Sequence, residues 1–193
     1  MIKTIRLGMQ HIEAILPSDP TLKIIHLVRD PRAIINSRLG LRLKGEIIEY
    51  NNLCNPIMED LEKSKEISKL FPGSILTVRY EDLAKAPIVA ARQIYSFLEL
   101  KMSSLIEQYI WNITHADLSE FNSFGTLRQD STKTANAWRH KLDYQTILDI
   151  EKTCTGLLEV LGYRLFQSED AVRNLNLSST YRLIDPDLMK LSI

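Results

Sequence analysis

Short apolar runs alternate with helical patterns along this chain, and together they predict an α/β fold. Residues 24–28 (Ile-Ile-His-Leu-Val) are expected to form a strand buried on both faces, and residues 75–80 a second strand. Residues 1–6 are a candidate third strand. Helical periodicity predicts helices over 31–40, over 57–71, from Pro87 onward and over 144–161. Strands that alternate with helices indicate a parallel sheet.

Capping residues and a long aperiodic stretch refine this outline. Asp30 is suited to cap the helix that starts at Pro31, and Gly162 is suited to end the helix over 144–161. The apolar stripe of that helix consists of Ile147, Ile150, Cys154, Leu157, Leu158 and Leu161. Residues 112–137 are polar and lack a helical period, so we expect a long loop there.

Composition narrows the class of protein. The 193 residues suit one domain, and 24 basic residues balance 24 acidic ones. A net charge of zero argues against a general nucleic-acid or membrane-surface binder. No run of about 18 apolar residues is present, and the first residues lack the apolar core of a signal peptide.

The cysteines and histidines offer no metal site. Cys54 and Cys154 are far apart in sequence, so they are either two isolated buried thiols or one disulfide. Two sequons, Asn112-Ile113-Thr114 and Asn176-Leu177-Ser178, are compatible with a secretory lumen. The four histidines lack the spacing of metal ligands: His11, His26, His115 and His140. His26 lies within a predicted strand, where we expect a buried, hydrogen-bonded side chain.

The junction after the first strand is the most informative stretch. The strand delivers Arg29 to its carboxyl end, which is where ligands bind in open α/β sheets. The following helix points its N-terminal N–H groups to the same place and carries the hydroxyl of Ser37. A guanidinium suits a phosphate group, so an anion site is one interpretation. The other is a surface turn in which Arg29, Asp30 and Arg32 form local ion pairs.

Four segments, in order, resemble the sulfotransferases that use 3′-phosphoadenosine 5′-phosphosulfate (PAPS). Arg29–Ala33 with Ser37-Arg38 resembles their 3′-phosphate motif, and Arg79–Leu83 with Pro87 resembles their next signature. Trp138–Leu142, then Cys154 and Leu161–Arg164, resemble the C-terminal segment of the Golgi carbohydrate sulfotransferases. That branch sulfates galactose, N-acetylglucosamine or N-acetylgalactosamine at the 6-hydroxyl. The resemblance runs from Lys3 to about Phe166.

The resemblance implies roles for residues that bind the donor. Arg29 and Ser37 would hold the 3′-phosphate, and Tyr80 would lie near the adenine. The long loop closes over the donor in this family. Arg139 and Lys133, together with Arg128, are therefore candidate cations around PAPS, although a solvated loop face is the simpler interpretation of any one of them.

The catalytic base is not identified by the resemblance. Lys3 resembles a lysine near the transferring sulfonate in cytosolic relatives, and a frayed terminal lysine is an equally good interpretation. Those relatives have their catalytic histidine two residues later, where this chain has Ile5. Asp30 is better suited to cap a helix than to act as a base.

The sequence also lacks a part of the family pattern. It has seven glycines, and none forms the Gly/Ser-rich loop that holds the 5′-phosphosulfate in these enzymes. We therefore expect the C-terminal part of a three-layer fold like that of P-loop NTPases, with a central parallel sheet but without the N-terminal strands and the phosphosulfate loop. Residues 1–166 would belong to the sulfotransferase domain, and residues 167–193 would form a polar tail.

The function implied is transfer of a sulfonate from PAPS, as co-substrate, to a hydroxyl of a glycan, without a metal ion. The full-length form would be anchored in the Golgi membrane and face the lumen, whereas this chain would contact neither membrane nor nucleic acid. An oxidising lumen implies a disulfide between Cys54 and Cys154. The alternative is a non-catalytic remnant that keeps the 3′-phosphate half of the site. A purely structural helical module would leave the four ordered segments unexplained.

Overall fold

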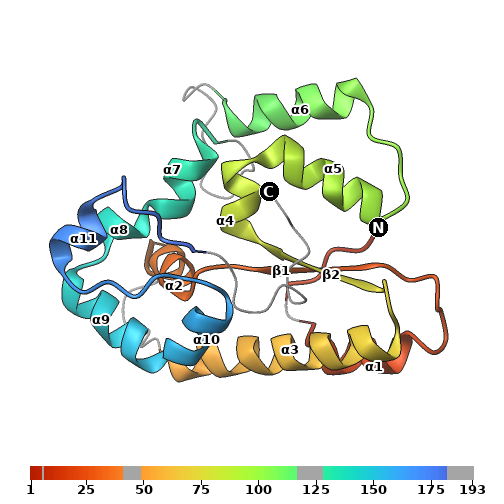
Figure 1. Cartoon of the computed structure of the whole chain (residues 1–193), viewed down its shortest axis with the longest axis horizontal. Coiled ribbons are helices and arrows are strands. Elements are labelled where there is room, and N and C mark those ends of the chain that lie inside the picture. The colour runs from red at the N-terminus through yellow and green to blue at the C-terminus, as the bar shows by residue number, and fades with distance from the viewer. Residues whose placement is uncertain (6, 41–48, 117–127, 182–193) are drawn as a thin grey trace.

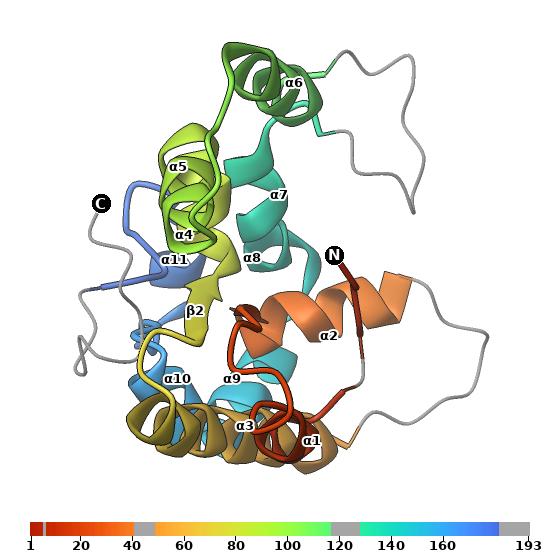
Figure 2. The ribbon, with the colours of Figure 1, turned by 90° about the vertical axis from the view of Figure 1, so that its right-hand side faces the viewer.

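Two short parallel strands lie at the centre of the fold, with helices on both sides of them (Figures 1 and 2). A computed structural model describes residues 1–5, 7–40, 49–116 and 128–181. Strand β1 (Ile24–Val28) pairs with β2 (Ile75–Arg79), with Ile24 opposite Ile75. The helices are α1 (Met9–Ile15), α2 (Pro31–Gly40), α3 (Asn51–Leu70), α4 (Tyr80–Lys85), α5 (Pro87–Phe97), α6 (Ser104–Thr114), α7 (Ser131–Asn136), α8 (Trp138–Lys141), α9 (Tyr144–Thr153), α10 (Thr155–Val160) and α11 (Glu169–Arg173).

The α/β class is confirmed as a mostly helical fold around a small parallel sheet. Both main strand predictions are confirmed within one residue at their ends. The third strand is wrong for residues 1–5, which form no strand, while residue 6 lies outside the described residues. Ile2 and Ile5 are 90% and 84% exposed, so no neighbouring strand covers them. Helices α1 and α3 lie on one side of the sheet, and α5 and α6 lie on the other (Figures 1 and 2).

Strand β1 buries one face, whereas the sequence predicted two buried faces. On the inner face Ile24 packs against the α1–α3 cluster, and the His26 ring forms a 2.8 Å hydrogen bond with the hydroxyl of Ser64 in α3. Burial lowers the pKa of His26, as expected of a buried imidazole. On the other face Ile25 and Leu27 remain exposed, because no described element covers this side of β1.

The predicted helix boundaries are confirmed in part. Helix α2 spans 31–40 as expected, and α5 begins at Pro87. Helix α3 begins at Asn51, earlier than the predicted residue 57, and it contains Pro56 inside the helix, past its first turn. Its end before Pro72-Gly73 is as expected, with Gly73 at a φ of 78°.

Two further corrections concern the C-terminal half of the chain. The helix predicted over 144–161 is divided into α9 and α10 at Cys154, and Gly162 ends it at a φ of 70°. The loop predicted over 112–137 contains the end of α6 and all of α7, while 117–127 lie outside the described residues. The hydrophobic periodicity did not predict α7, because polar contacts hold this helix in place. The Ser131 hydroxyl, for example, donates to the carbonyl of Ala84 at 2.6 Å.

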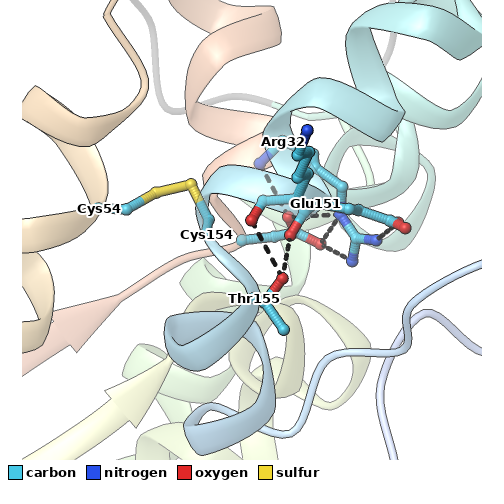
Figure 3. The surroundings of a disulfide bond; sticks show 7 residues. Arg32, Cys54, Glu151, Cys154 and Thr155 are labelled. Carbon is cyan, nitrogen blue, oxygen red and sulfur yellow. Dashed lines mark hydrogen bonds and ion pairs between the residues drawn. A yellow bond between two sulfur atoms is a disulfide. The ribbon is translucent and has the colours of Figure 1, made fainter.

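A disulfide joins the two sides of the main core. Cys54 in α3 bonds to Cys154 between α9 and α10, with 5.6 Å between their Cα atoms, so the disulfide interpretation is confirmed (Figure 3). The bond lies inside an apolar cluster that contains the predicted stripe of α9 and α10, all of it buried. The covalent link therefore fixes α3 against these helices at a point where they already pack.

Residues 168–181 pack against the rest of the chain. Val172 in α11 is fully buried, and Tyr163 forms an antiparallel bridge with Thr180. The predicted polar tail over 167–193 therefore includes an ordered, partly buried segment, and its last residues, 182–193, lie outside the described residues.

Loss of the disulfide should destabilise the fold. The bond spans 100 residues, so replacing both cysteines (Cys54→Ala with Cys154→Ala) frees the unfolded chain from a large closed loop. We expect the free energy of unfolding to fall by roughly 2–5 kcal/mol. Urea unfolding followed by tryptophan fluorescence measures this difference. Reductant should shift the wild-type midpoint but not that of the double variant; equal midpoints for both proteins in oxidising buffer would contradict the prediction.

Candidate functional site

The two strands end side by side and place their next residues together. Val28 lies opposite Arg79 in the parallel register, so Arg29 and Tyr80 follow the carboxyl ends of neighbouring strands. The Arg29 guanidinium carbon lies over the Tyr80 ring, 4.5 Å from its centroid. The structure thus brings together two residues that the sequence placed in one site. A cation–π contact of this kind restrains the guanidinium without occupying its hydrogen-bond donors.

Arg29 keeps unused donor capacity at this position. Its Nε is buried and has no hydrogen-bond partner in the described part of the chain. A buried donor without a partner costs free energy, unless a ligand or water satisfies it. The guanidinium fork is therefore available to an anion at the carboxyl ends of the strands, which is where open α/β sheets bind ligands.

Asp30 starts helix α2 directly after Arg29. Its carboxylate accepts a hydrogen bond of 2.9 Å from the N–H of Arg32, which confirms its expected role as a helix cap. Two turns further along α2, Ser37 is exposed, so its hydroxyl is accessible to solvent. The junction therefore offers a guanidinium and an accessible hydroxyl on one short segment.

The remaining predicted cations lie in different surroundings. Lys3 is exposed in a segment without helix or strand. Lys133 lies in α7, with its side chain 83% exposed and its ammonium group 3.8 Å from the Asp130 carboxylate. Arg128 borders the segment outside the described residues, and its N–H donates to the carbonyl of Ile113. Within the part of the chain that the structure describes, Lys3 and Lys133 do not contact Arg29.

Arg139 has a structural role that differs from the predicted one. Its side chain is buried, and its guanidinium donates to the carbonyl oxygens of Ala171, Val172, Asn174 and Leu177. These bonds hold the segment around α11 against α8. Because its donors are used inside the protein, Arg139 is not included in the site that we propose.

The ion pair between Asp30 and Arg32 belongs to the second interpretation of this junction, but the structure buries it and adds Glu151, which the sequence did not predict. Arg32 is fully buried; it donates to Asp30 at 2.8 Å, to the carboxylate of Glu151 and to the carbonyl of Arg164 (Figure 3). Its guanidinium also lies over the Trp138 ring, 4.2 Å from the centroid. The sequence held a signal, because Glu151 falls on the apolar stripe of α9, four residues after Ile147.

Glu81 connects the site to the C-terminal half of the chain. One carboxylate oxygen accepts from the N–H of Asp30 at 3.2 Å, and the other accepts from the hydroxyl of Tyr163 at 2.6 Å. Burial, and then the nearby charge of Asp30, raise the pKa of Glu81 to about 7, while the bond from Tyr163 opposes the rise. A titrating group therefore holds the backbone next to Arg29.

The described residues contain neither a cluster of metal-ligating side chains nor a helix able to span a membrane. No group of three or more His, Cys, Asp and Glu side chains there could hold a metal ion. No helix in the same part of the chain has both the length and the apolar character needed to cross a membrane.

Comparisons with known proteins agree with the segments identified in the sequence. Residues 6–104 match the profile of the sulfotransferase family. Human carbohydrate sulfotransferases 5 and 6 are each 32% identical to this chain, with alignments that cover 92% of it and 49% and 51% of the relatives. Carbohydrate sulfotransferase 1 of Danio rerio is 30% identical, and its alignment covers 92% of this chain and 47% of that relative. The chain spans about half the length of the curated relatives it matches. No solved structure matches.

The raised pKa of Glu81 predicts a pH-dependent stability. Folding favours protonated Glu81, because its pKa rises from 4.5 to about 7. The stability that protonated Glu81 contributes is fully present below pH 4.5 and is lost as the pH rises through 7. The free energy of unfolding should therefore fall by up to about 3 kcal/mol over this range. Urea unfolding between pH 4.5 and 8 should show this fall in the wild type and a flatter profile in Glu81→Gln.

A second variant sharpens this test. Tyr163→Phe removes the hydrogen bond that opposes the rise in pKa, so the fall in stability should extend to higher pH. A Glu81→Gln protein with the same pH profile as the wild type would contradict the assignment.

Proposed function

Since this chain belongs to the sulfotransferase family, we propose that its β1–α2 junction binds the 3′-phosphate of PAPS in a protein that transfers sulfonate to a carbohydrate hydroxyl. The observation that carries this proposal is the Arg29 guanidinium, stacked on Tyr80 at the strand ends with a buried, unpartnered Nε. A phosphate oxygen would satisfy that donor and meet a side chain already held in place.

The proposed phosphate site combines charge with directional donors. Arg29 would supply a charged fork, and Ser37 would supply a neutral hydroxyl from the exposed side of α2. The site would keep Tyr80 near the adenine, as the family resemblance implies, while its ring also orients Arg29. Lys133, Arg128 and Lys3 stay candidate cations for the remaining charge of the donor.

The transfer itself moves a sulfonate group between two oxygens. The bond between sulfur and the 5′-phosphate oxygen breaks, a bond from sulfur to the sugar oxygen forms, and the hydroxyl proton leaves to a base. Residues around the donor must align both oxygens and stabilise the charge on the leaving phosphate. Arg29 and Ser37 would hold the far end of the donor and thereby fix the position of the reacting end. We assign no base to the described residues.

The carbohydrate acceptor and the cellular location rest on the relatives. Those reported above are carbohydrate sulfotransferases, so we propose a glycan hydroxyl, the 6-hydroxyl in this branch, as the acceptor. We further propose the Golgi lumen, with a membrane anchor in the full-length form. The Cys54–Cys154 disulfide supports an oxidising compartment.

Membership of the sulfotransferase family also implies a finer description of the fold. We propose that residues 1–166 form the C-terminal part of a three-layer sulfotransferase domain that resembles P-loop NTPases, and that 168–181 are packed onto it. The parallel pair of strands with helices on both sides supports this proposal.

A second function applies to the chain by itself: nucleotide binding without transfer. The sequence contains no Gly/Ser-rich loop for the 5′-phosphosulfate, which favours this alternative for the isolated 193 residues. The two functions differ in one measurable property, because both require the 3′-phosphate site but only the first requires turnover.

Substitutions at the junction should weaken nucleotide binding to different extents. We expect Arg29→Ala to lower the affinity for adenosine 3′,5′-bisphosphate by about 2 kcal/mol, roughly 30-fold, because a charged pair of donors is lost. Ser37→Ala should cost about 1 kcal/mol, roughly fivefold, because a neutral donor is lost. Isothermal titration calorimetry measures both.

A matched variant separates local from general charge effects. Arg92 in α5 forms a surface ion pair with Glu107 in α6, so Arg92→Ala removes one positive charge outside the β1–α2 junction and should leave the affinity unchanged. Unchanged affinity in Arg29→Ala, or an equal loss in Arg92→Ala, would overturn the phosphate site.

The isolated chain should not transfer sulfonate at a useful rate. The phosphosulfate loop would contribute several charge-assisted hydrogen bonds, each worth roughly 1.5–3 kcal/mol, so its absence costs many powers of ten in rate. The assay is radiolabel transfer from PAPS to an oligosaccharide that ends in N-acetylglucosamine, with a full-length relative as the positive control. Turnover by the purified 193-residue chain would refute this expectation.

A further inference from the structure

Glu81 joins the two strand ends that carry the candidate site. It directly follows Tyr80, and its Oε1 accepts a hydrogen bond of 3.2 Å from the N–H of Asp30, which directly follows Arg29. The two residues of the cation–π contact are therefore each next in sequence to a partner of this hydrogen bond. A change in the Glu81 carboxyl group thus reaches the backbone on both sides of the site.

The same carboxyl group is enclosed by the protein. Glu81 is 7% exposed, and its second oxygen accepts from the hydroxyl of Tyr163 at 2.6 Å. Burial, and then the nearby charges of Glu81 and Asp30, raise the pKa of Tyr163, so its hydroxyl remains a neutral donor near pH 7. The two hydrogen-bond donors to Glu81 are both neutral, and neither supplies a positive charge.

The cations around this carboxyl group are paired or point to solvent. The buried ion pairs are those of Arg32 with Asp30 and Glu151, and of Arg79 with Asp82. Helices α5 and α7 pack on α4, and the cations of these three helices are exposed: Lys85, Arg92 and Lys133. Among the described residues no cation forms an ion pair with Glu81. Ionised Glu81 is thus a buried charge without a counter-charge, which favours its protonated form.

A phosphate bound to Arg29 would favour the protonated form further. It would neutralise the guanidinium, which forms no ion pair within the described part of the chain, and it would add negative charge near Asp30 and Glu81. For two unit charges roughly 10 Å apart at an effective dielectric constant of about 20, repulsion shifts a pKa by about one unit. Phosphate binding should therefore raise the pKa of Glu81 above its value of about 7 in the free protein.

We infer that Glu81 is a positioning residue that takes up a proton when the 3′-phosphate binds to Arg29, so that nucleotide affinity falls as the pH rises. The proton comes from solvent and binds a carboxylate oxygen. A protonated carboxyl group keeps acceptor capacity, so Asp30 and Tyr163 can still donate to it and the strand ends stay aligned. The inference rests on the proposed phosphate site and needs neither sulfonate transfer nor a carbohydrate acceptor.

Isothermal titration calorimetry counts the protons taken up. The 193-residue chain is titrated with adenosine 3′,5′-bisphosphate at pH 7.5 in Tris and in HEPES, whose enthalpies of ionisation differ, and the difference in apparent binding enthalpy gives the uptake. We expect roughly half a proton per nucleotide, for a pKa that rises from about 7 to about 8. A phosphate monoester has its second pKa near 6, so the nucleotide itself is already ionised at this pH.

Two matched variants assign the proton to Glu81. Glu81→Gln keeps a hydrogen-bonding side chain of similar size but cannot titrate, so it should bind the nucleotide without proton uptake. The wild-type affinity divided by that of Glu81→Gln should fall up to about tenfold between pH 6 and 9, and this ratio cancels the ionisation of the nucleotide. Glu107→Gln makes the same change in α6, where Glu107 pairs with Arg92, and should leave proton uptake and affinity as in the wild type.

Further measurements separate position from charge. Glu81→Ala removes the bond from Asp30 and should lower the affinity roughly fivefold already at pH 6, where the charge is absent. Tyr163→Phe removes the bond that opposes the rise in the pKa of Glu81, so proton uptake should be greatest at a higher pH than in the wild type. Carbon-13 NMR of the Glu81 carboxyl carbon in the wild type, with and without nucleotide, measures the pKa directly and does not depend on any variant folding.

Three results would overturn the inference and leave the phosphate site intact. They are nucleotide binding by the wild type without proton uptake, equal uptake in Glu81→Gln, and a carboxyl resonance that titrates at the same pH with and without nucleotide. Absence of nucleotide binding at every pH would instead reject the proposed function and this inference together.

Discussion

The buried guanidinium of Arg32 is the contact on which the arrangement of this fold depends. It joins Asp30 at the end of β1 to Glu151 in α9, and it lies over Trp138 in α8. A buried charge is stable only while its partners remain, and removing one partner of such a pair typically costs about 3–5 kcal/mol. The position of the strand end is therefore tied to the C-terminal helices, which hold no strand of their own.

Two other arginines extend this principle. Arg79 forms a two-point pair with Asp82 and donates to the carbonyl of Leu161, and Arg139 donates to four carbonyls around α11. The carbonyls that accept these bonds lie at the ends of α10 and α11 and in the segment after α11, and the last carbonyls of a helix have no partner within it. Guanidinium groups supply the missing donors, which explains why Arg139, a candidate cation for the donor in the sequence, has its hydrogen bonds inside the protein.

Arg29 differs from these arginines, and the difference carries the functional argument. Its neighbours Asp30 and Arg32 use their polar groups inside the protein, whereas its own Nε is buried without a partner in the described residues. Tyr80 restrains the guanidinium from one side. Glu81, bonded to the N–H of Asp30, fixes the adjoining backbone. The surroundings thus position one arginine and leave its donors available.

Sequence alone determined the features that depend on local chemistry. The strand at 24–28, the strand predicted over 75–80 and observed over 75–79, and the start of α2 at Pro31 followed from apolar runs and capping residues. The joint placement of Arg29 and Tyr80 followed from the family resemblance. The tertiary structure decided which charges are buried, because Arg32 meets Glu151 across 119 residues and Glu81 meets Tyr163 across 82. It also showed that β1 is open on one side and that Arg139 is structural. Contacts of such separation depend on how the helices pack, and no local pattern records that packing.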